Sequence, residues 1–156
     1  MMTFDEAKYA LAELTNDEGY KGLSAEAKQQ AIFDLAKEIS VETTGTKTVL
    51  YSGYVDGKRA MDIAEAMADA DSNIRIINKT DVGKFLDSVE FKDAIAQTEG
   101  LTEYKWDTAL ELTEVKNKLY HPTNSPWAEA SKRFVSSAKG EIMLIAGEGR
   151  ETSVFN

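Results

Sequence analysis

The fold of this chain is decided by residues 125–156, which read SPWAEASKRFVSSAKGEIMLIAGEGRETSVFN. Ser125 is a good N-cap, because its hydroxyl can accept hydrogen bonds from the free amides of a first helical turn. Pro126 then falls at the first helical position, where its missing N–H is not needed. The residues that follow recur at helical spacing and predict a helix that Gly140 ends; they are Trp127, Ser131, Phe134, Val135 and Ala138.

The next segment, residues 142–146 (IMLIA), is a continuous apolar run that is short enough for a strand. A strand that is apolar on both faces usually lies inside a parallel sheet that helices cover on both sides. We therefore expect residues 142–146 to be buried in an α/β fold. Ligands of open α/β sheets bind beyond the carboxyl ends of the strands, so residues 147–156 are predicted to lie at the site.

Two further strands are predicted upstream, over residues 48–52 (TVLYS) and 73–78 (NIRIIN), because both are rich in β-branched and aromatic residues. A helical pattern over residues 60–71 joins them, and a strand–helix–strand unit of about thirty residues is long enough for a parallel crossover. The sequence thus predicts a small, mainly parallel sheet of residues 48–52, 73–78 and 141–146, flanked by helices.

The N-terminal part, residues 1–42, is predicted to form a helical hairpin that packs on the α/β core of residues 48–156. Its first helix begins with a capping box, in which Thr3 and Glu6 bind each other's backbone amides. A turn over residues 16–22 leads to a second helix that Ser24 caps. We find neither an internal repeat nor a linker, and so expect residues 1–156 to form a single domain.

Composition narrows the class of function. The chain has 156 residues, 42% of them hydrophobic and 29% charged, and a net charge of −9. This acidic balance repels nucleic acids and anionic membranes, so neither is a predicted partner. A DNA-mimicking inhibitor would need carboxylates in rows on one face, whereas the acidic residues here are spread evenly. With no cysteine and a single histidine, His121, the sequence predicts no disulfide, no thiolate nucleophile and no metal site.

Targeting signals are absent from the residues at hand. No apolar run approaches the ~20 residues that span a bilayer. The N-terminus, MMTFDEAKYALAEL, is acidic and lacks the basic and apolar regions of a signal peptide. We therefore expect a cytosolic protein, in the producing cell or in a target cell that receives it as part of a larger effector.

Three segments carry aromatic and hydroxyl residues toward one predicted edge of the sheet: residues 50–53 (LYSG), residues 80–83 (TDVG), and the Trp127 helix with its strand and tail. In this order and spacing they resemble the ADP-ribosyl cyclase / NAD glycohydrolase family, which includes bacterial toxin domains. The resemblance covers roughly residues 48–156. It is most specific at Trp127-x-x-x-Ser131-x-x-Phe134 and at Ser153-x-Phe155.

The resemblance implies an α/β enzyme that cleaves the nicotinamide–ribose bond of NAD⁺, with NAD⁺ as substrate and no separate cofactor. It assigns Trp127 to stacking on nicotinamide and matches Tyr51 to the aromatic residue at the end of the first core strand, so these two are the candidate catalytic residues. The residues that it predicts to bind the dinucleotide are Ser52, Gly53, Thr80, Ser131, Ser153 and Phe155. For a toxin or effector of this group, it also implies a cognate immunity protein as partner.

The family's catalytic glutamate would lie a few residues beyond Asn156, because Glu148 and Glu151 precede the Ser-x-Phe motif. The family's auxiliary acid has Asp81 as its nearest candidate. Either the sequence is a truncated or processed piece, or the site has lost its carboxylate, and low cleavage activity is expected in both cases. The alternative is a non-catalytic, acidic interaction or inhibitor protein on the same scaffold, in which Trp127 is a core residue, Ser131 bonds its own helix and Thr80 is only an N-cap.

Overall fold

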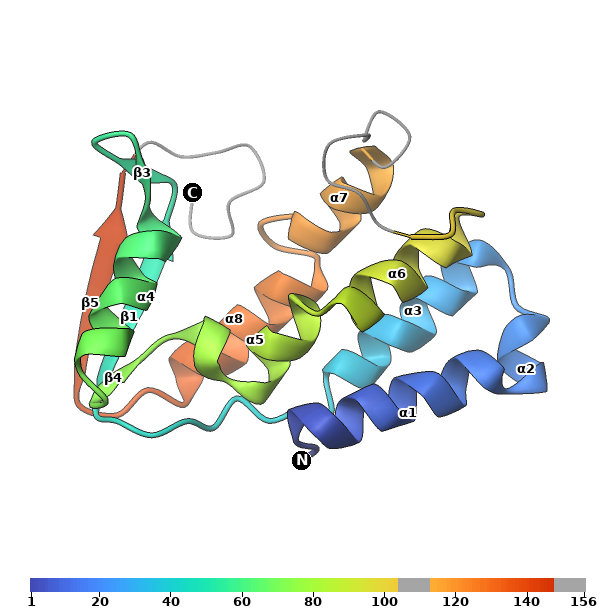
Figure 1. Ribbon diagram of the computed structural model, residues 1–156, viewed down its shortest axis with the longest axis horizontal. Helices are drawn as coiled ribbons and strands as arrows, with labels where there is room; N and C mark the ends of the chain where they lie inside the picture. Colours follow the sequence, from blue (N-terminus) through green and yellow to red (C-terminus); the bar gives the residue numbers. More distant parts are fainter. Residues whose placement is uncertain (104–112, 148–156) are drawn as a thin grey trace.

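The sheet has three parallel strands in the order β4-β1-β5, and helix α4 (Ala60–Ala70) packs on one of its faces (Figure 1). This computed structural model describes residues 1–103 and 113–147. Strand β1 (Lys47–Ser52) is central and pairs along its whole length with β5 (Glu141–Ala146), from Lys47 opposite Glu141 to Ser52 opposite Ala146. The predicted α/β class with a small parallel sheet is therefore confirmed.

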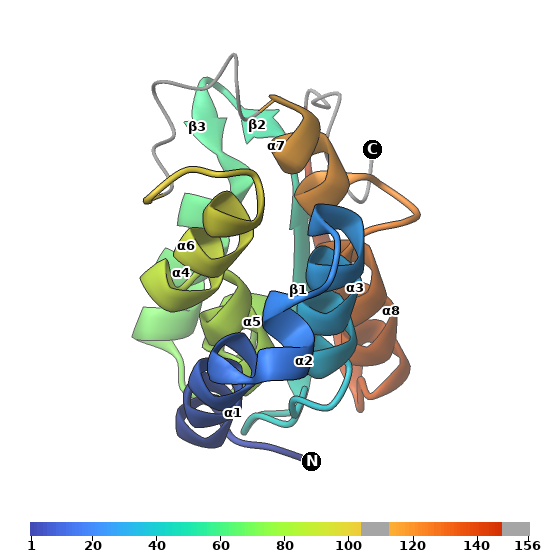
Figure 2. The same cartoon turned by 90° about the vertical axis from the view of Figure 1, so that its right-hand side faces the viewer.

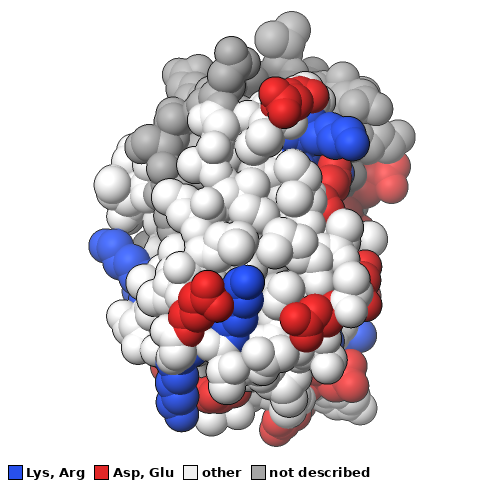
Figure 3. All heavy atoms as spheres, turned by 90° about the vertical axis from the view of Figure 1, so that its left-hand side faces the viewer, with Lys and Arg blue, Asp and Glu red and all other residues white. Residues whose placement is uncertain are grey.

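Strand β5 differs from its prediction, because it is an edge strand and not a buried one. Among the described residues it pairs with β1 alone, and its side chains Ile142 and Leu144 are 52% and 58% exposed. The face of the molecule that carries β5 and α4 includes a broad area without charged side chains (Figure 3). Apolar residues on both faces of a strand make its burial favourable, but they do not show which other elements of the chain lie beside it.

Strand β4 (Ile74–Arg75) is also shorter than the predicted strand over residues 73–78. The chain turns after Ile76 into the 3₁₀ helix η1 (Ile77–Lys79), because the carbonyl of Ile77 accepts hydrogen bonds from both the amide and the hydroxyl of Thr80. Thr80 then caps helix α5 (Asp81–Leu86). This local side-chain capping competes with the sheet and ends the strand.

The N-terminal helices follow their predicted caps. Helix α1 (Phe4–Asn16) has both hydrogen bonds of the capping box between Thr3 and Glu6, and Ser24 caps helix α3 (Ala25–Ala36). A short helix, α2 (Glu18–Lys21), replaces the predicted turn. It forms because the Asp17 carboxylate accepts from the Tyr20 amide at 3.1 Å, which is an N-cap that the prediction overlooked.

The remaining described elements are α6 (Val89–Thr98), α7 (Thr113–Tyr120), α8 (Pro126–Ser136) and a hairpin of β2 (Tyr54–Val55) and β3 (Lys58–Arg59). The hairpin turns at Asp56-Gly57, where both residues have positive φ, as tight two-residue hairpins require. No helix within residues 1–103 and 113–147 is long and apolar enough to cross a membrane.

Two hydrophobic clusters hold these elements together. The larger cluster joins the N-terminal helices to α5, α6 and α8 and includes Phe85, Phe91 and Phe134. The smaller cluster lies between α4 and the sheet and includes Val49, Ala64 and Ile76. Tyr51 contacts both clusters. In the view turned by 90°, α4 and α8 lie on opposite sides of β1 (Figure 2).

Candidate functional site

Helix α8 begins with a well-ordered set of local hydrogen bonds. Ser125 accepts from the Ala128 amide at 3.1 Å and donates to the His121 carbonyl at 2.7 Å, so it is the predicted N-cap. The Nδ1 atom of His121 accepts from the amides of Thr123 and Asn124, at 3.2 and 3.0 Å. The imidazole thereby shapes the loop that sets the start of α8, which gives the single histidine a structural role.

The far end of α8 is tied to the sheet by a buried arginine. Arg75 is 3% exposed, and its guanidinium donates to the hydroxyl of Thr48 at 2.7 Å and to that of Ser137 at 3.0 Å. The same guanidinium lies over the Phe134 ring, 4.7 Å from its centre, in cation–π geometry. These contacts fix the C-terminal half of α8 on the face of the sheet that Thr48 presents.

Trp127, Ser131 and Phe134 are spaced four and three residues apart and therefore share one side of α8. Phe134 is fully buried, and Trp127 is half-buried against the larger hydrophobic cluster. Ser131 is 5% exposed, and its hydroxyl has no hydrogen-bond partner in the part of the chain that the structure describes. Helical serines commonly bond back to the carbonyl four residues earlier, and here that bond is absent.

A buried hydroxyl without a partner is unfavourable, because folding has removed its water and supplied nothing in exchange. Buried polar groups in folded proteins nearly always have a partner, so each exception needs an explanation. Ser131 lies one turn after Trp127, near the middle of α8. The start of this helix is held by the His121 loop, and its C-terminal half is held by Arg75. A ligand atom that reaches this hydroxyl would supply the missing partner.

The carboxyl end of β1 carries Tyr51, Ser52 and Gly53. Successive side chains of a strand point to opposite faces, so Tyr51 shares a face with Val49 beneath α4, whereas Ser52 shares a face with Thr48 and hence with α8. The hydroxyl of Tyr51 donates to Asn78 Oδ1, and the Asn78 amide donates to Glu65 Oε1 at 3.3 Å. The structure thus places Ser52 on the α8 side, and Tyr51 on the other side in a polar chain to α4.

Ser52 is 6% exposed, and its carbonyl accepts from the amide of Gly147 at 3.3 Å, at the ends of both strands. Gly53 has a φ of +70°, and its carbonyl accepts from the Ala60 amide at the start of α4 at 2.9 Å. Gly53 therefore supplies the left-handed backbone that turns the chain from β1 into the hairpin.

Thr80 has a structural explanation. It is fully buried, its hydroxyl donates to the Ile77 carbonyl, and the same oxygen accepts from the Gly83 amide at 3.0 Å. The one O–H donor of Thr80 is used and the residue is inaccessible to solvent, so Thr80 is not part of the site. Ser153 and Phe155 lie outside the described residues.

Sequence reasoning overlooked Arg75 and Asn78, which position α8 and the Tyr51 hydroxyl. A signal for Arg75 was present, because an arginine inside the apolar segment NIRIIN must find polar or aromatic partners when it is buried. Asn78 had no such signal, since it contacts Tyr51 only through the pairing of segments 27 residues apart.

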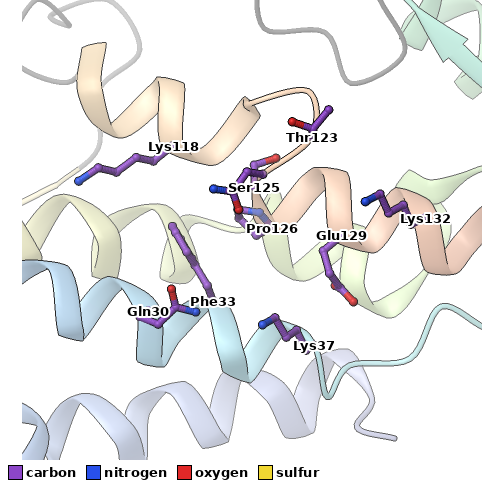
Figure 4. A pocket seen from close by; sticks show the side chains of 10 residues that line it. Gln30, Phe33, Lys37, Lys118, Thr123, Ser125, Pro126, Glu129 and Lys132 are labelled. Carbon is purple, nitrogen blue, oxygen red and sulfur yellow. The ribbon is translucent and has the colours of Figure 1, made fainter.

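A separate cavity of about 330 Å³ lies between α3, α7 and the start of α8 (Figure 4). Its lining carries three lysines, Lys37, Lys118 and Lys132, and one glutamate, Glu129. Lys37 pairs with Asp34 at 3.2 Å, and Glu129 pairs with Arg133 at 2.8 Å. Glu129 projects from the side of α8 opposite Trp127, because two residues along a helix turn the side chain by about 200°. The cavity is therefore not part of the arrangement around Trp127 and Ser131.

Comparisons of the chain with protein-family models, with curated proteins and with solved structures find no match. Functional inference therefore depends on the side chains themselves. On the α8 side of the sheet these are a half-buried indole, a buried hydroxyl without a partner, and the strand-end residues Ser52 and Gly53.

Proposed function

We propose that this chain is an NAD⁺-binding domain of the NAD glycohydrolase / ADP-ribosyl cyclase type, with its dinucleotide site on the side of α8 that carries Trp127 and Ser131. Ser131 is 5% exposed, and the lack of a hydrogen-bond partner for its hydroxyl among the described residues is the single observation that carries the proposal. A phosphate oxygen is an acceptor that this hydroxyl can donate to. The half-buried Trp127, one turn away, offers an aromatic face for nicotinamide.

The chemistry of NAD⁺ cleavage suits such a site. The nicotinamide–ribose bond breaks through an oxocarbenium-like transition state, and nicotinamide leaves as a neutral molecule, so no strong general acid is needed. The protein mainly has to hold the dinucleotide, stack its ring and place negative charge near the developing cation. Trp127, Ser131 and Ser52 would perform the binding and orienting parts. The resemblance assigns the carboxylate to a position past Asn156.

The decisive measurement is therefore binding. The chain has two tryptophans, so a Trp106→Phe background isolates the emission of Trp127 during titration with NAD⁺. With one aromatic stack contributing about 1 kcal/mol and few hydroxyl contacts, we expect a Kd on the order of 0.1–1 mM. Ser131→Ala should weaken binding about tenfold, whereas Ser137→Ala, on the same helix but bonded to Arg75, should not.

Nicotinamide release, followed by chromatography, tests the catalytic part. Trp127→Ala is expected to abolish NAD⁺ binding while the fold, measured by circular dichroism, is retained. If both serine variants bind NAD⁺ as the parent chain does, Ser131 contacts no dinucleotide and the proposal fails.

A toxin or effector role with a cognate immunity protein belongs to the same proposal and follows from the resemblance alone. The second candidate is a non-catalytic interaction protein. One observation favours it, namely the open, apolar edge strand β5.

A further inference from the structure

Strand β5 has the composition of a central strand and the position of an edge strand. Its five residues from Ile142 to Ala146 are all apolar, yet β1 is its one pairing partner in the described ranges. Ile142 and Leu144 lie on the same face as Thr48 and Leu50 and are 52% and 58% exposed. Natural edge strands are usually protected by an inward charge, a proline or a bulge, and β5 has none of these between residues 142 and 146.

One hydrogen bond shows which backbone N–H and C=O groups of β5 point away from β1. The amide of Gly147 donates to the carbonyl of Ser52 on β1. Since backbone groups alternate along a strand, residues 143 and 145 also face β1, whereas the N–H and C=O groups of Ile142, Leu144 and Ala146 face outward. Three residues at alternate positions thus offer both a donor and an acceptor to another strand.

We propose that β5 pairs with β5 of a second copy of this chain, antiparallel about a two-fold axis at Leu144. In this register the outward residues form three hydrogen-bonded pairs: Leu144 with its own copy, and Ile142 with Ala146 in both directions. On the α4 face Met143 lies opposite Ile145, so every pair between residues 142 and 146 is apolar with apolar. The result is a continuous six-stranded sheet with the same patch on both copies, as a two-fold interface requires.

The register is selective. Moving the axis to Met143 places Glu141 opposite Ile145 of the second copy, and moving it to Ile145 places Met143 opposite Gly147. The first alternative puts a carboxylate against an apolar side chain, and the second forms fewer apolar pairs between residues 142 and 146. The axis at Leu144 leaves Glu141 opposite Gly147, where its ion pair with Lys47, at 3.8 Å, is retained.

The apolar pairing pattern and the uncharged surface around β5 favour a second copy as the occupant. Each chain carries a net charge of −9, which opposes association in general, but the face that carries β5 has a broad uncharged area (Figure 3). β5 also lies at the outer end of the sheet (Figure 1). Added salt should therefore strengthen the dimer, because it screens the repulsion between two acidic chains and leaves the apolar contact intact.

The contact is small. A six-residue strand is about 20 Å long, and pairing two such edges buries less than the 1,200–2,000 Å² of a standard stable interface. We therefore expect a reversible dimer with a dissociation constant on the order of 100 µM.

Cysteine cross-linking tests the register directly, because the chain contains no cysteine. Leu144→Cys brings two thiols together on the axis, where paired Cα atoms lie about 5.5 Å apart, within the range of a disulfide. Val89→Cys is the matched control, since Val89 is more exposed, at 69%, and lies at the start of α6 away from β5. At about 100 µM protein, Leu144→Cys should form disulfide dimer at least roughly tenfold faster than Val89→Cys.

Sedimentation equilibrium and hydrogen exchange give independent readouts. The parent chain should increase in average mass with concentration, and Leu144→Lys should remain monomeric with an unchanged circular dichroism spectrum. The amides of Ile142 and Leu144 should exchange quickly in dilute protein and slowly in concentrated protein. Equal cross-linking rates for the two cysteine variants, or a parent chain that stays monomeric up to about 1 mM, overturn the proposal.

If the chain proves monomeric, hydrogen exchange of the Ile142 and Leu144 amides shows what covers the edge of β5. Amides protected at every concentration would mean that a segment of the same chain covers β5. Amides that exchange quickly at every concentration would leave the edge to a different protein. Both results contradict the two-fold pairing, and neither bears on NAD⁺ binding.

Discussion

Replacement of Ser131 by alanine should stabilise the protein. Alanine has the higher helix propensity, worth about 0.5 kcal/mol in a helix interior. Ser131 is 5% exposed, and its hydroxyl has no partner among the described residues, so removing it relieves a desolvation cost of about 1 kcal/mol or more. The small void left by one oxygen offsets part of this gain. The net expectation is an increase of about 1 kcal/mol in the free energy of unfolding, or about 2–4 °C in Tm for a chain of this length.

The serines at the two caps of α8 provide controls of opposite sign. Ser137 accepts from Arg75 and donates to the Phe134 carbonyl at 2.8 Å, so Ser137→Ala should cost about 1–2 kcal/mol. Ser125 caps the helix, and its replacement by alanine should cost about 1 kcal/mol. Urea unfolding followed by circular dichroism, with the slope m checked for constancy, measures all three variants against the parent chain.

Two outcomes would contradict the role proposed for Ser131. If Ser131→Ala destabilises the protein as much as Ser137→Ala does, the Ser131 hydroxyl has a partner, and its link to a ligand loses its basis. If Ser131→Ala stabilises the protein and leaves the Kd for NAD⁺ unchanged, the hydroxyl is unsatisfied for a reason other than NAD⁺.

Three further predictions follow from buried or constrained groups. Arg75→Lys should cost about 2–3 kcal/mol in urea unfolding, because an ammonium cannot hold two hydroxyls and stack on a ring together; a loss below about 0.5 kcal/mol would contradict this. Gly83→Ala should cost at least about 3 kcal/mol, since its Cβ would lie 1.9 Å from the Ile77 carbonyl oxygen, and a Tm near that of the parent chain would refute it. Burial raises the pKa of Tyr20 above its ordinary value of 10.0, so the folded state favours the neutral phenol, and stability should fall as the pH rises above 10.0. Thermal unfolding of Tyr20→Phe between about pH 9 and pH 11 should show a shallower fall, and parallel curves would count against it.

The sequence predicted best those features that depend on residues three or four positions apart. The caps at Thr3, Ser24 and Ser125 are all present, because an N-cap bond joins neighbours in the chain and needs no tertiary partner. Strands β1 and β5 were also predicted to within a residue at either end, from apolar runs bounded by turn residues.

Tertiary neighbours were predicted less well. The apolar run of β5 indicated a central strand, but the order β4-β1-β5 places it at an edge. At the site, the two-residue period of a strand places Tyr51 and Ser52 on opposite faces of the sheet, and Tyr51 packs against both hydrophobic clusters. The contacts of Arg75 and Asn78 depend on how α8 and η1 dock, and docking is not encoded in local spacing.

The same hydroxyl that lowers stability in the free chain should raise affinity in the complex, and thermodynamic linkage makes the two effects comparable. A ligand that binds only the folded state stabilises it by RT ln(1 + [L]/Kd). At an NAD⁺ concentration ten times the parent Kd, the parent chain gains about 1.4 kcal/mol. Ser131→Ala, with a Kd about tenfold higher, gains about 0.4 kcal/mol. The difference of about 1 kcal/mol equals the higher stability expected for Ser131→Ala in the absence of NAD⁺. The urea midpoints of the two proteins should therefore converge as NAD⁺ is added, coincide at this concentration, and cross above it. Midpoints that rise in parallel would mean that Ser131 contributes to folding alone.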